Sequence, residues 1–339
     1  MIKAKGHMSG FDSHSYHSLG RIGEIMLDVK LLGTGGMMPL LNRYLTSMLI
    51  KYNGMSILVD CGEATQLALR NAGESSKDID VICITHFHAD HIGGLPGLLL
   101  LMGNQGKTSP LTIIGPRGLE KVVNGLRIVA PVLPFEIKIK ELISDTDYGC
   151  NKFKLNELTI HTFNELTVKA FRVNHKVACY GYTFELHRLP KFEVEKALKL
   201  GLEKKYWGRL QHGETIAVDG VIYRPEDVLG DSRKGLKITY VTDSRPCDNI
   251  ILNAKESDLF ICEAMYGAND KRDDALEKKH MMMSEAAKLA KLANVKQLWL
   301  THYSPSMLNP KEYMEDTKKI FRNTIFPKDG QHLEMKFED

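Results

Sequence analysis

The chain contains 339 residues, of which 43% are hydrophobic and 26% charged, a balance typical of globular proteins and sufficient to bury a large core. Its 45 Lys and Arg against 42 Asp and Glu leave a net charge of +3, too small by itself to indicate a polyanionic partner. No apolar run approaches the roughly 18 residues of a membrane span, and the six scattered cysteines, without a CxxC pair, indicate reduced thiols in a cytoplasmic protein.

The start of the chain differs in character from the rest. Residues 1–25 are polar and lack the apolar region of an export signal, so we expect a polar N-terminal extension there and one large domain at 26–339. The apolar run at 26–32 predicts the first strand of that domain. The glycine-rich turn after it is not a dinucleotide loop, because Met38 stands where G-x-G-x-x-G requires its third glycine.

The next elements indicate an antiparallel hairpin followed by alternating helices and strands. Two apolar runs at 46–52 and 55–59 flank Asn53-Gly54, the dipeptide most typical of a two-residue hairpin turn. Periodicity predicts helices at 64–71, 95–102 and 284–293, and strands at 81–84, 111–114, 155–165, 166–173, 237–242, 258–263 and 295–300. Strands interleaved with helices over this length predict an α/β sandwich.

The most specific pattern in the chain follows the apolar run at 81–84. Three imidazoles and one carboxylate lie within six positions, at His86, His88, Asp90 and His91. These are side-chain types that bind Zn²⁺, and a metal offsets the desolvation of so many polar groups beside a buried strand. In an extended segment His86 and His88 point to the same side, whereas Asp90 and His91 follow where the chain turns. The spacing therefore predicts two ions, about 3.5–4 Å apart.

Two clustered ions need more ligands than this turn supplies. We expect the others at strand ends that face the same cleft. Three side chains meet that condition, because each lies within two positions of the end of a predicted strand: His175, Asp243 and His302.

The pattern His86, His88, Asp90 and His91 resembles the HxHxDH motif of the metallo-β-lactamase superfamily. Further segments resemble, in order, motifs of the ribonuclease Z family of tRNA 3′-processing endonucleases, from about position 29 to 307; they lie at 32–35 with Arg43, 60–66, 242–245, 262–264 and 300–304. The resemblance implies an α/β fold, a four-layer αββα sandwich with two mixed β-sheets flanked by helices.

The same resemblance implies roles for individual residues. One Zn²⁺ would be held by His86, His88 and His175, and the second by Asp90, His91 and His302, with Asp243 bridging both. Zinc fits this imidazole-rich set, and Mn²⁺ is also possible. Asp90 is the implied general base, and His280, oriented by Glu263, the implied proton donor to the leaving oxygen. The implied substrate contacts are Arg43, Ser304, Lys204, Lys205 and Arg209.

One segment departs from the periodicity of the core. At about 188–213 charge rises, and over 188–212 seven Lys and Arg stand against three Glu, with Tyr206 and Trp207 among them. We interpret this as an inserted basic arm that contacts RNA phosphates, the alternative being a solvated surface helix at 192–200. The family resemblance implies that the arm of one subunit serves its partner's site in a homodimer.

Some positions depart from the family pattern. Met282 stands where the family usually has Thr, Ser306 and Met307 where it has Arg-Tyr, and Tyr44 where it has Asn. The leading hypothesis is a dinuclear zinc phosphodiesterase, an endoribonuclease that removes 3′ trailers from precursor tRNA. The alternatives are a phosphodiesterase for small or cyclic phosphodiesters, a glyoxalase-II-like thioesterase, or a catalytically weak metal-bound RNA-binding scaffold.

Overall fold

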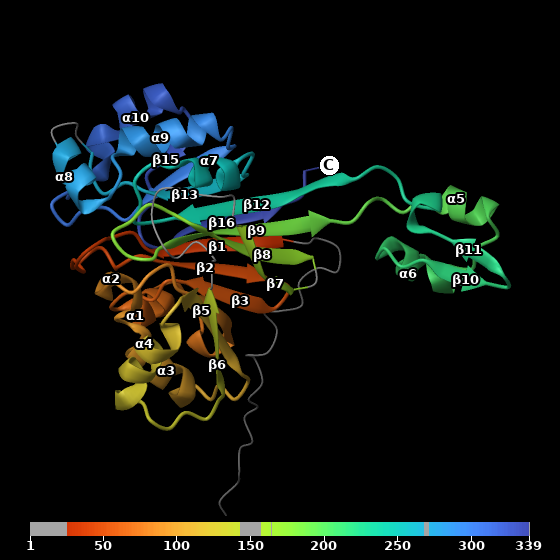
Figure 1. Cartoon of the computed structure of the whole chain (residues 1–339), viewed down its shortest axis with the longest axis horizontal. Coiled ribbons are helices and arrows are strands. Elements are labelled where there is room, and N and C mark those ends of the chain that lie inside the picture. Colours follow the sequence, from red (N-terminus) through yellow and green to blue (C-terminus); the bar gives the residue numbers. More distant parts are fainter. Residues whose placement is uncertain (1–25, 143–156, 164, 268–270, 339) are drawn as a thin grey trace, which may run out of the picture.

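Two seven-stranded sheets pack face to face, and helices cover the outer face of each (Figure 1). This computed structural model describes residues 26–142, 157–163, 165–267 and 271–338. The predicted N-terminal extension, residues 1–25, and Cys150, one of the six cysteines, lie outside these ranges. Both sheets contain parallel and antiparallel pairs, so the predicted four-layer αββα arrangement with two mixed sheets is confirmed.

The first sheet has the order β16-β1-β2-β3-β4-β5-β6. Its strands are β1 (Met26–Gly33), β2 (Ser47–Tyr52), β3 (Met55–Val59), β4 (Ile79–Cys83), β5 (Leu111–Pro116), β6 (Ile137–Leu142) and β16 (Gln331–Lys336). The predicted hairpin joins β2 to β3, and its turn residues Asn53 and Gly54 both have positive φ, 47° and 81°. Two positive φ values in a two-residue turn match the twist of antiparallel strands, which explains this dipeptide.

The second sheet has the order β15-β14-β13-β12-β9-β8-β7. Its strands are β7 (Glu157–Phe163), β8 (Leu166–Arg172), β9 (Tyr180–Arg188), β12 (Arg233–Val241), β13 (Leu259–Glu263), β14 (Gln297–Thr301) and β15 (Thr324–Ile325). Strands β12, β13 and β14 are parallel neighbours, so their carboxyl ends meet at one edge of the sheet. That edge carries Asp243, Glu263 and His302, which end or follow these three strands.

The helices fall into two groups by the sheet that they cover (Figure 1). The first sheet is covered by α1 (Thr65–Asn71), α2 (Ala89–Ile92), α3 (Leu95–Asn104) and α4 (Leu119–Leu126). The second is covered by α7 (Asp248–Ala254), α9 (Met283–Leu292) and α10 (Met314–Ile320). Helix α8 (Arg272–Lys278) packs through Ala275 against Met265 and Tyr266, which follow β13. Among the described residues, no helix is long and apolar enough to cross a membrane.

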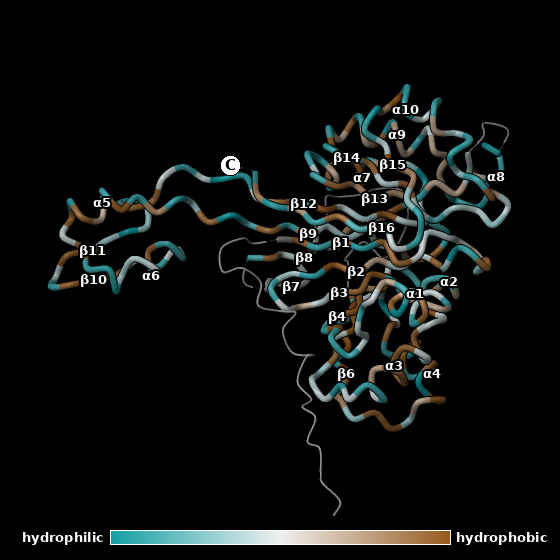
Figure 2. The backbone as a smooth tube through the Cα atoms, turned by 180° about the vertical axis from the view of Figure 1, so that it is seen from behind, coloured by the Kyte–Doolittle hydropathy of each residue, from teal (hydrophilic) through white to brown (hydrophobic). Residues whose placement is uncertain are grey.

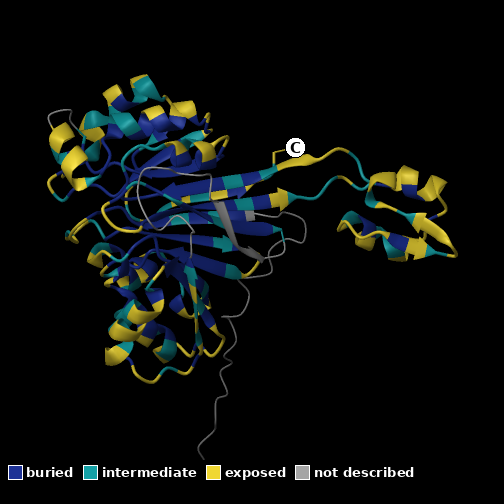
Figure 3. Cartoon of the chain, viewed as in Figure 1, coloured by how far each residue is buried: buried dark blue, intermediate teal, exposed yellow. Residues whose placement is uncertain are grey.

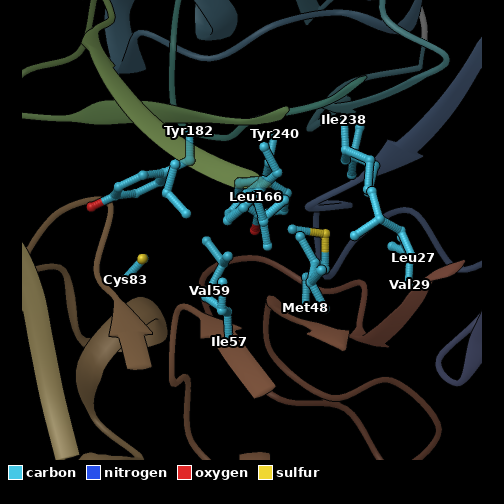
Figure 4. Packing of buried hydrophobic residues seen from close by; sticks show 14 of the residues in the cluster. Leu27, Val29, Met48, Ile57, Val59, Cys83, Leu166, Tyr182, Ile238 and Tyr240 are labelled. Atoms are coloured by element: carbon cyan, nitrogen blue, oxygen red, sulfur yellow. The ribbon is translucent and has the colours of Figure 1, made fainter. Parts of the chain in front are cut away.

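Three apolar clusters hold the layers together. Apolar residues run along the strands of both sheets (Figure 2), and the buried positions gather between the layers (Figure 3). The central cluster joins the facing sides of the two sheets through residues such as Met48, Val59, Leu166, Tyr182 and Tyr240 (Figure 4). The other two lie between each sheet and its helices. Burial of these apolar side chains holds the two sheets rigidly together. The rigid sheets in turn position the loops at the end that they share.

The segment that departs from the core periodicity forms a separate projecting unit at 189–232 (Figure 1). It contains α5 (Val194–Lys199), α6 (Trp207–Gln211), β10 (Ile216–Val218), β11 (Val221–Tyr223) and two short 3-10 helices, η3 (Lys204–Tyr206) and η4 (Pro225–Asp227). Ala197, Leu202, Leu210, Ile216 and Val228 form its own small core. The unit therefore extends beyond the predicted end at 213, because its second half completes that core.

The longer boundary changes the charge of the arm. Over 189–232 the sequence has seven Lys and Arg against eight Asp and Glu, because the hairpin half is acidic. The projecting unit as a whole is therefore not basic. Its cations are concentrated in the half that contains α5 and α6. This half corresponds to the segment for which we predict contacts with RNA phosphates.

Candidate metal centre

The predicted ligands leave the two sheets at neighbouring strand ends. His86 and His88 follow β4, and Asp90 and His91 lie in the short helix α2 directly after them. His88 itself is extended, with φ −67° and ψ 149°, so the chain turns only after the second histidine. His86 and His88 fall in one group of possible metal ligands and Asp90 and His91 in another, which is the division that the spacing predicted.

Where the polar groups converge, three residues that follow strands are in the left-handed conformation. Asp60 follows β3 with φ 59°, Asp243 follows β12 with φ 45°, and His302 follows β14 with φ 57°. This region costs free energy for residues with a side chain, and Asp, Asn and His adopt it more often than most. Asp60 contacts His91, and Asp243 contacts both His91 and His302, so the three left-handed residues lie where the polar groups converge.

Four side chains form a first ligand cluster. His86 Nε2 lies 2.9 Å from His88 Nδ1 and 3.6 Å from Asp243 Oδ2. His175 Nε2 lies 3.4 Å from His88 Nδ1 and 3.8 Å from the same Asp243 oxygen. Of these residues only His88 is exposed to any extent; the others are buried.

A second cluster lies on the other side of Asp243. His91 Nε2 and His302 Nε2 are 3.2 Å apart, and they lie 3.5 and 3.4 Å from Asp90 Oδ2. Each of these two nitrogens is also 3.1 Å from Asp243 Oδ1. Asp243 therefore presents one carboxylate oxygen to each cluster.

These distances fit tetrahedral metal coordination. Two atoms bound to one Zn²⁺ at about 2.0–2.1 Å lie about 3.3–3.4 Å apart in a tetrahedral site. The ligand-atom separations in the two clusters, 2.9–3.8 Å and 3.1–3.5 Å, centre on that value. Imidazole nitrogens and carboxylate oxygens are suitable donors for zinc, and each cluster offers several. The side chains present could thus hold a pair of divalent ions with Asp243 between them.

Further contacts orient the imidazoles of the two clusters. Asp60, fully buried, lies 2.9 Å from His91 Nδ1 and also accepts the backbone N–H of Thr85 at 2.8 Å. His175 Nδ1 lies 3.1 Å from the carbonyl oxygen of Lys279. A partner on the second ring nitrogen fixes the tautomer and leaves the first as a lone-pair donor.

Glycine is required where the backbone passes closest to the second cluster. A Cβ on Gly36 would lie 2.6 Å from the His302 ring, and a Cβ on Gly62 would lie 2.3 Å from the carbonyl oxygen of Asp90. The loop that contains Gly36 also orients a ligand, because the N–H of Met37 donates to Asp90 Oδ2 at 2.7 Å.

Burial and neighbouring carboxylates shift the pKa values of the clustered residues in different directions. Burial lowers the pKa of His86 well below its usual value, so the imidazole is neutral. Burial alone would raise the pKa of Asp243, but His302, His91 and His86 around it lower that pKa well below its usual value. Burial would also lower the pKa of His91, but Asp243 and Asp60 raise that pKa well above its usual value. His86 and Asp243 therefore have the forms that coordinate a divalent ion, a neutral imidazole and an ionised carboxylate.

The predicted pair Glu263 and His280 meets beside this centre. Glu263 ends β13, is fully buried, and lies 3.1 Å from His280 Nδ1. His280 Nδ1 is also 3.7 Å from Asp243 Oδ2. Burial would lower the pKa of His280, but the Glu263 carboxylate and Asp243 raise that pKa to about 9. The imidazole therefore carries a proton at neutral pH, next to the ligand shared by the two clusters.

The predicted substrate-binding residues are dispersed. Arg43 is half-buried and donates to the carbonyl oxygens of Ser304 and Leu308 at 3.3 and 3.1 Å, near the second cluster. The arm residues Lys205 and Arg209 are exposed but paired within the arm, with Glu203 at 2.9 Å and with Glu214 at 2.8 Å. Lys204 lies over the ring of Trp207, 5.9 Å from its centroid.

Sequence reasoning missed several residues that support the centre. Asp60, Gly36 and the ion pair of Arg245 with Glu285 had no predicted role. The indication for Asp60 was present, because it ends a predicted strand as Asp243 and His302 do. The Arg245 pair spans 40 positions of sequence, and no local pattern indicates it.

Comparisons with known proteins agree with this fold. A family model described as Anti-Pycsar protein Apyc1 matches residues 27–189. The crystal structure of human tRNase Z, short form, superimposes with a TM-score of 0.66 and 26% identity, covering 90% of this chain and 98% of that one. The metallo-β-lactamase fold protein YhfI from Bacillus subtilis gives 0.64 at 20% identity, covering 92% and 100%, which shows the shared fold.

Sequence relatives extend over nearly the whole chain. A ribonuclease Z from Lachnospira eligens is 52% identical over 314 residues, which are 93% of this chain and 99% of the relative. A ribonuclease Z from Clostridium acetobutylicum is 48% identical over 314 residues, 93% of this chain and 100% of the relative. Identity at this level over the full length of the relatives, together with the fold and the ligand clusters, shows that the chain belongs to the ribonuclease Z family.

Proposed function

We propose that the protein is a dinuclear zinc endoribonuclease that removes 3′ trailers from precursor tRNA. The observation that carries the proposal is Asp243, whose two oxygens each face one complete ligand cluster. When bound, the two ions would lower the pKa of a water molecule and withdraw charge from the phosphate. The relatives named ribonuclease Z and the likeness to human tRNase Z support precursor tRNA as the substrate.

In this proposal Asp90 accepts the proton of the attacking water. Burial would raise the pKa of Asp90, but hydrogen bonds from His302 and His91 lower it well below its usual value, so the carboxylate is ionised. The N–H of Met37 holds Oδ2 in place at 2.7 Å, which fixes the direction in which the other oxygen points. A positioned, ionised carboxylate at the reacting centre is suited to general-base work.

His280 then donates a proton to the leaving 3′ oxygen. A ribose alkoxide is a poor leaving group at neutral pH, so protonation is needed as the bond to phosphorus breaks. The contact from Nδ1 to Glu263 keeps the ring charged and leaves Nε2 as the donor. Because the nitrogen nearest Asp243 is the one already bound to Glu263, we assign His280 to proton transfer and not to metal binding.

We further propose that Arg43 and Ser304 contact the substrate near the second cluster, and that Lys204, Lys205 and Arg209 contact tRNA phosphates from the arm. The ion pairs within the arm are exposed, where such pairs contribute little, so they do not prevent these cations from binding phosphate. A homodimer and a cytoplasmic location are part of the same proposal. Light scattering of the full chain tests the dimer.

Cleavage of a 3′-extended precursor tRNA tests the proposed function. The zinc-loaded chain is expected to make a single cut that releases the trailer, and Asp90→Ala is expected to lose at least about 10²-fold in rate. Asp273→Ala, an exposed carboxylate on α8, is the matched control and should retain the wild-type rate. A wild-type chain that binds zinc but leaves the trailer attached would contradict the proposal.

The charge of the arm favours one alternative, a phosphodiesterase for small phosphodiesters. The projecting unit as a whole is not basic, and Lys205 and Arg209 have internal partners. The unit can be removed cleanly, because Arg188 and Arg233 at its base are register partners on neighbouring antiparallel strands. An Asn-Gly turn in place of 189–232 should close that hairpin. Loss of tRNA cleavage with retained hydrolysis of bis(p-nitrophenyl) phosphate supports the RNase and the role of the arm in it. A full-length chain that hydrolyses bis(p-nitrophenyl) phosphate but does not cut precursor tRNA favours the alternative.

A further inference from the structure

The segment that carries His280 is held by a side chain at every residue. The carbonyl oxygen of Lys279 lies 3.1 Å from His175 Nδ1, and that of His280 accepts a hydrogen bond from Arg245 at 2.6 Å. The next two N–H groups donate to carboxylates, Met281 to Glu263 at 3.1 Å and Met282 to Glu285 at 3.0 Å. A loop fixed at four consecutive residues holds its imidazole in one place.

Arg245 and Glu285 supply two of these four contacts and also bind each other. The Arg245 guanidinium donates to Glu285 Oε2 at 2.7 Å from the same nitrogen that binds the His280 carbonyl, and its second nitrogen binds Oε1. Both side chains are largely buried, with 13% and 17% exposed. A two-point pair of this kind is planar and directional, so it transmits position as well as charge.

The backbone around Arg245 links the pair to the metal centre. Arg245 follows the bridging ligand Asp243 by two residues, and its N–H donates to the carbonyl oxygen of Asn174 at 2.9 Å, next to His175. Between them, the N–H of Ser244 donates to Glu263. One short turn thus holds the ligand shared by both clusters and the guanidinium that holds the proton donor.

We propose that Arg245, braced by Glu285, is a positioning residue that sets the His280 imidazole relative to the scissile phosphate. This rests on the proposed function, because it concerns the proton donor of that reaction. Arg245 contacts neither ligand cluster through its side chain in the contacts described, so its effect passes through the His280 backbone. Lysine cannot replace Arg245, because a single ammonium group does not reproduce the two guanidinium nitrogens that bind the His280 carbonyl oxygen and the Glu285 carboxylate together.

The leaving group of the substrate separates this role from a structural one. Cleavage of precursor tRNA needs a proton on the leaving oxygen, whereas p-nitrophenolate leaves bis(p-nitrophenyl) phosphate without one. Arg245→Gln should therefore lower saturating turnover of precursor tRNA by about 10–10²-fold, since a misplacement near 1 Å has costs of that order. Hydrolysis of bis(p-nitrophenyl) phosphate and zinc content should stay within about threefold of wild type, as in the matched control Arg272→Gln on the exposed face of α8.

A double-variant comparison completes the test. If Arg245 acts through His280, then Arg245→Gln adds nothing to the loss caused by His280→Ala. The proposal would be overturned if the losses of rate in the double variant multiplied, or if Arg245→Gln cut precursor tRNA at the wild-type rate. It would also be overturned if Arg245→Gln lost activity on both substrates in parallel and lost zinc. Should Arg245→Gln not fold, Arg245→Lys is measured in the same way, and parallel loss in that variant overturns it equally. A wild-type chain that does not cut precursor tRNA would instead remove the proposed function.

Discussion

Replacing Gly36 with alanine is predicted to disable the second ligand cluster and spare the first. A Cβ at Gly36 lies 2.6 Å from Cε1 and 2.7 Å from Nε2 of His302. Carbon atoms in contact lie at least about 3.5 Å apart, so the ring has to move by roughly 0.9 Å. The loop cannot retreat instead, because the N–H of Gly36 is bound to the carbonyl oxygen of Tyr303 at 3.0 Å, beside the ring that it would have to avoid.

A displacement of that size removes a ligand. It is close to half the length of a zinc–nitrogen bond of about 2.0–2.1 Å. We therefore expect Gly36→Ala to retain about one zinc ion per chain instead of two after desalting, measured by plasma mass spectrometry. Turnover of precursor tRNA should fall by about 10²-fold or more, because both ions are needed to clamp the reacting phosphate.

The control for this substitution lies in helix α4. A Cβ on Gly125 meets nothing within 4 Å, so Gly125→Ala should keep both ions and stabilise the helix slightly. A Gly36→Ala chain that retained two ions and wild-type turnover would refute the argument from contact distances.

Three further predictions concern the groups around the clusters. Glu263→Gln leaves His280 without its carboxylate, so turnover of precursor tRNA should fall by about 10²–10⁴-fold, while hydrolysis of bis(p-nitrophenyl) phosphate changes little; equal losses would contradict this. Asp60→Asn weakens the contact that orients His91, so zinc affinity, measured by competition with a chelator, should drop by about 10–100-fold. Unchanged zinc affinity would indicate that Asp60 has only a structural role. Removing metal by chelation should lower the melting temperature, since ions at a hundred times their dissociation constant add about 2.7 kcal/mol, and an unchanged melting temperature would count against bound metal in the native state.

Much of the fold could be predicted from local patterns, because its strands are apolar and are separated by recognisable turn residues. The turn at Asn53-Gly54 and the run before His86 are examples in which residue type alone determines the element. The convergence at one sheet edge was also predictable, because each of His175, Asp243 and His302 follows an apolar strand. The structure places all three around the histidine turn.

Other features depend on contacts that no local pattern records. Strand β16, at the end of the sequence, pairs with β1 at its start, and Arg245 binds Glu285, 40 positions later in the sequence. The projecting unit continues beyond the basic segment at 188–213, because its second half is acidic and charge alone does not indicate it. Its small core needs Ile216 and Val228 from that half, which explains why the unit continues to 232.

The central claim is that Asp243 lies between two bound ions. Anomalous diffraction from crystals of the zinc-loaded chain, recorded on either side of the zinc absorption edge, tests it most directly. The account predicts two peaks about 3.5–4 Å apart, one beside His86, His88 and His175 and the other beside Asp90, His91 and His302, with one Asp243 oxygen toward each. A single peak, or two peaks that do not share Asp243, would contradict it.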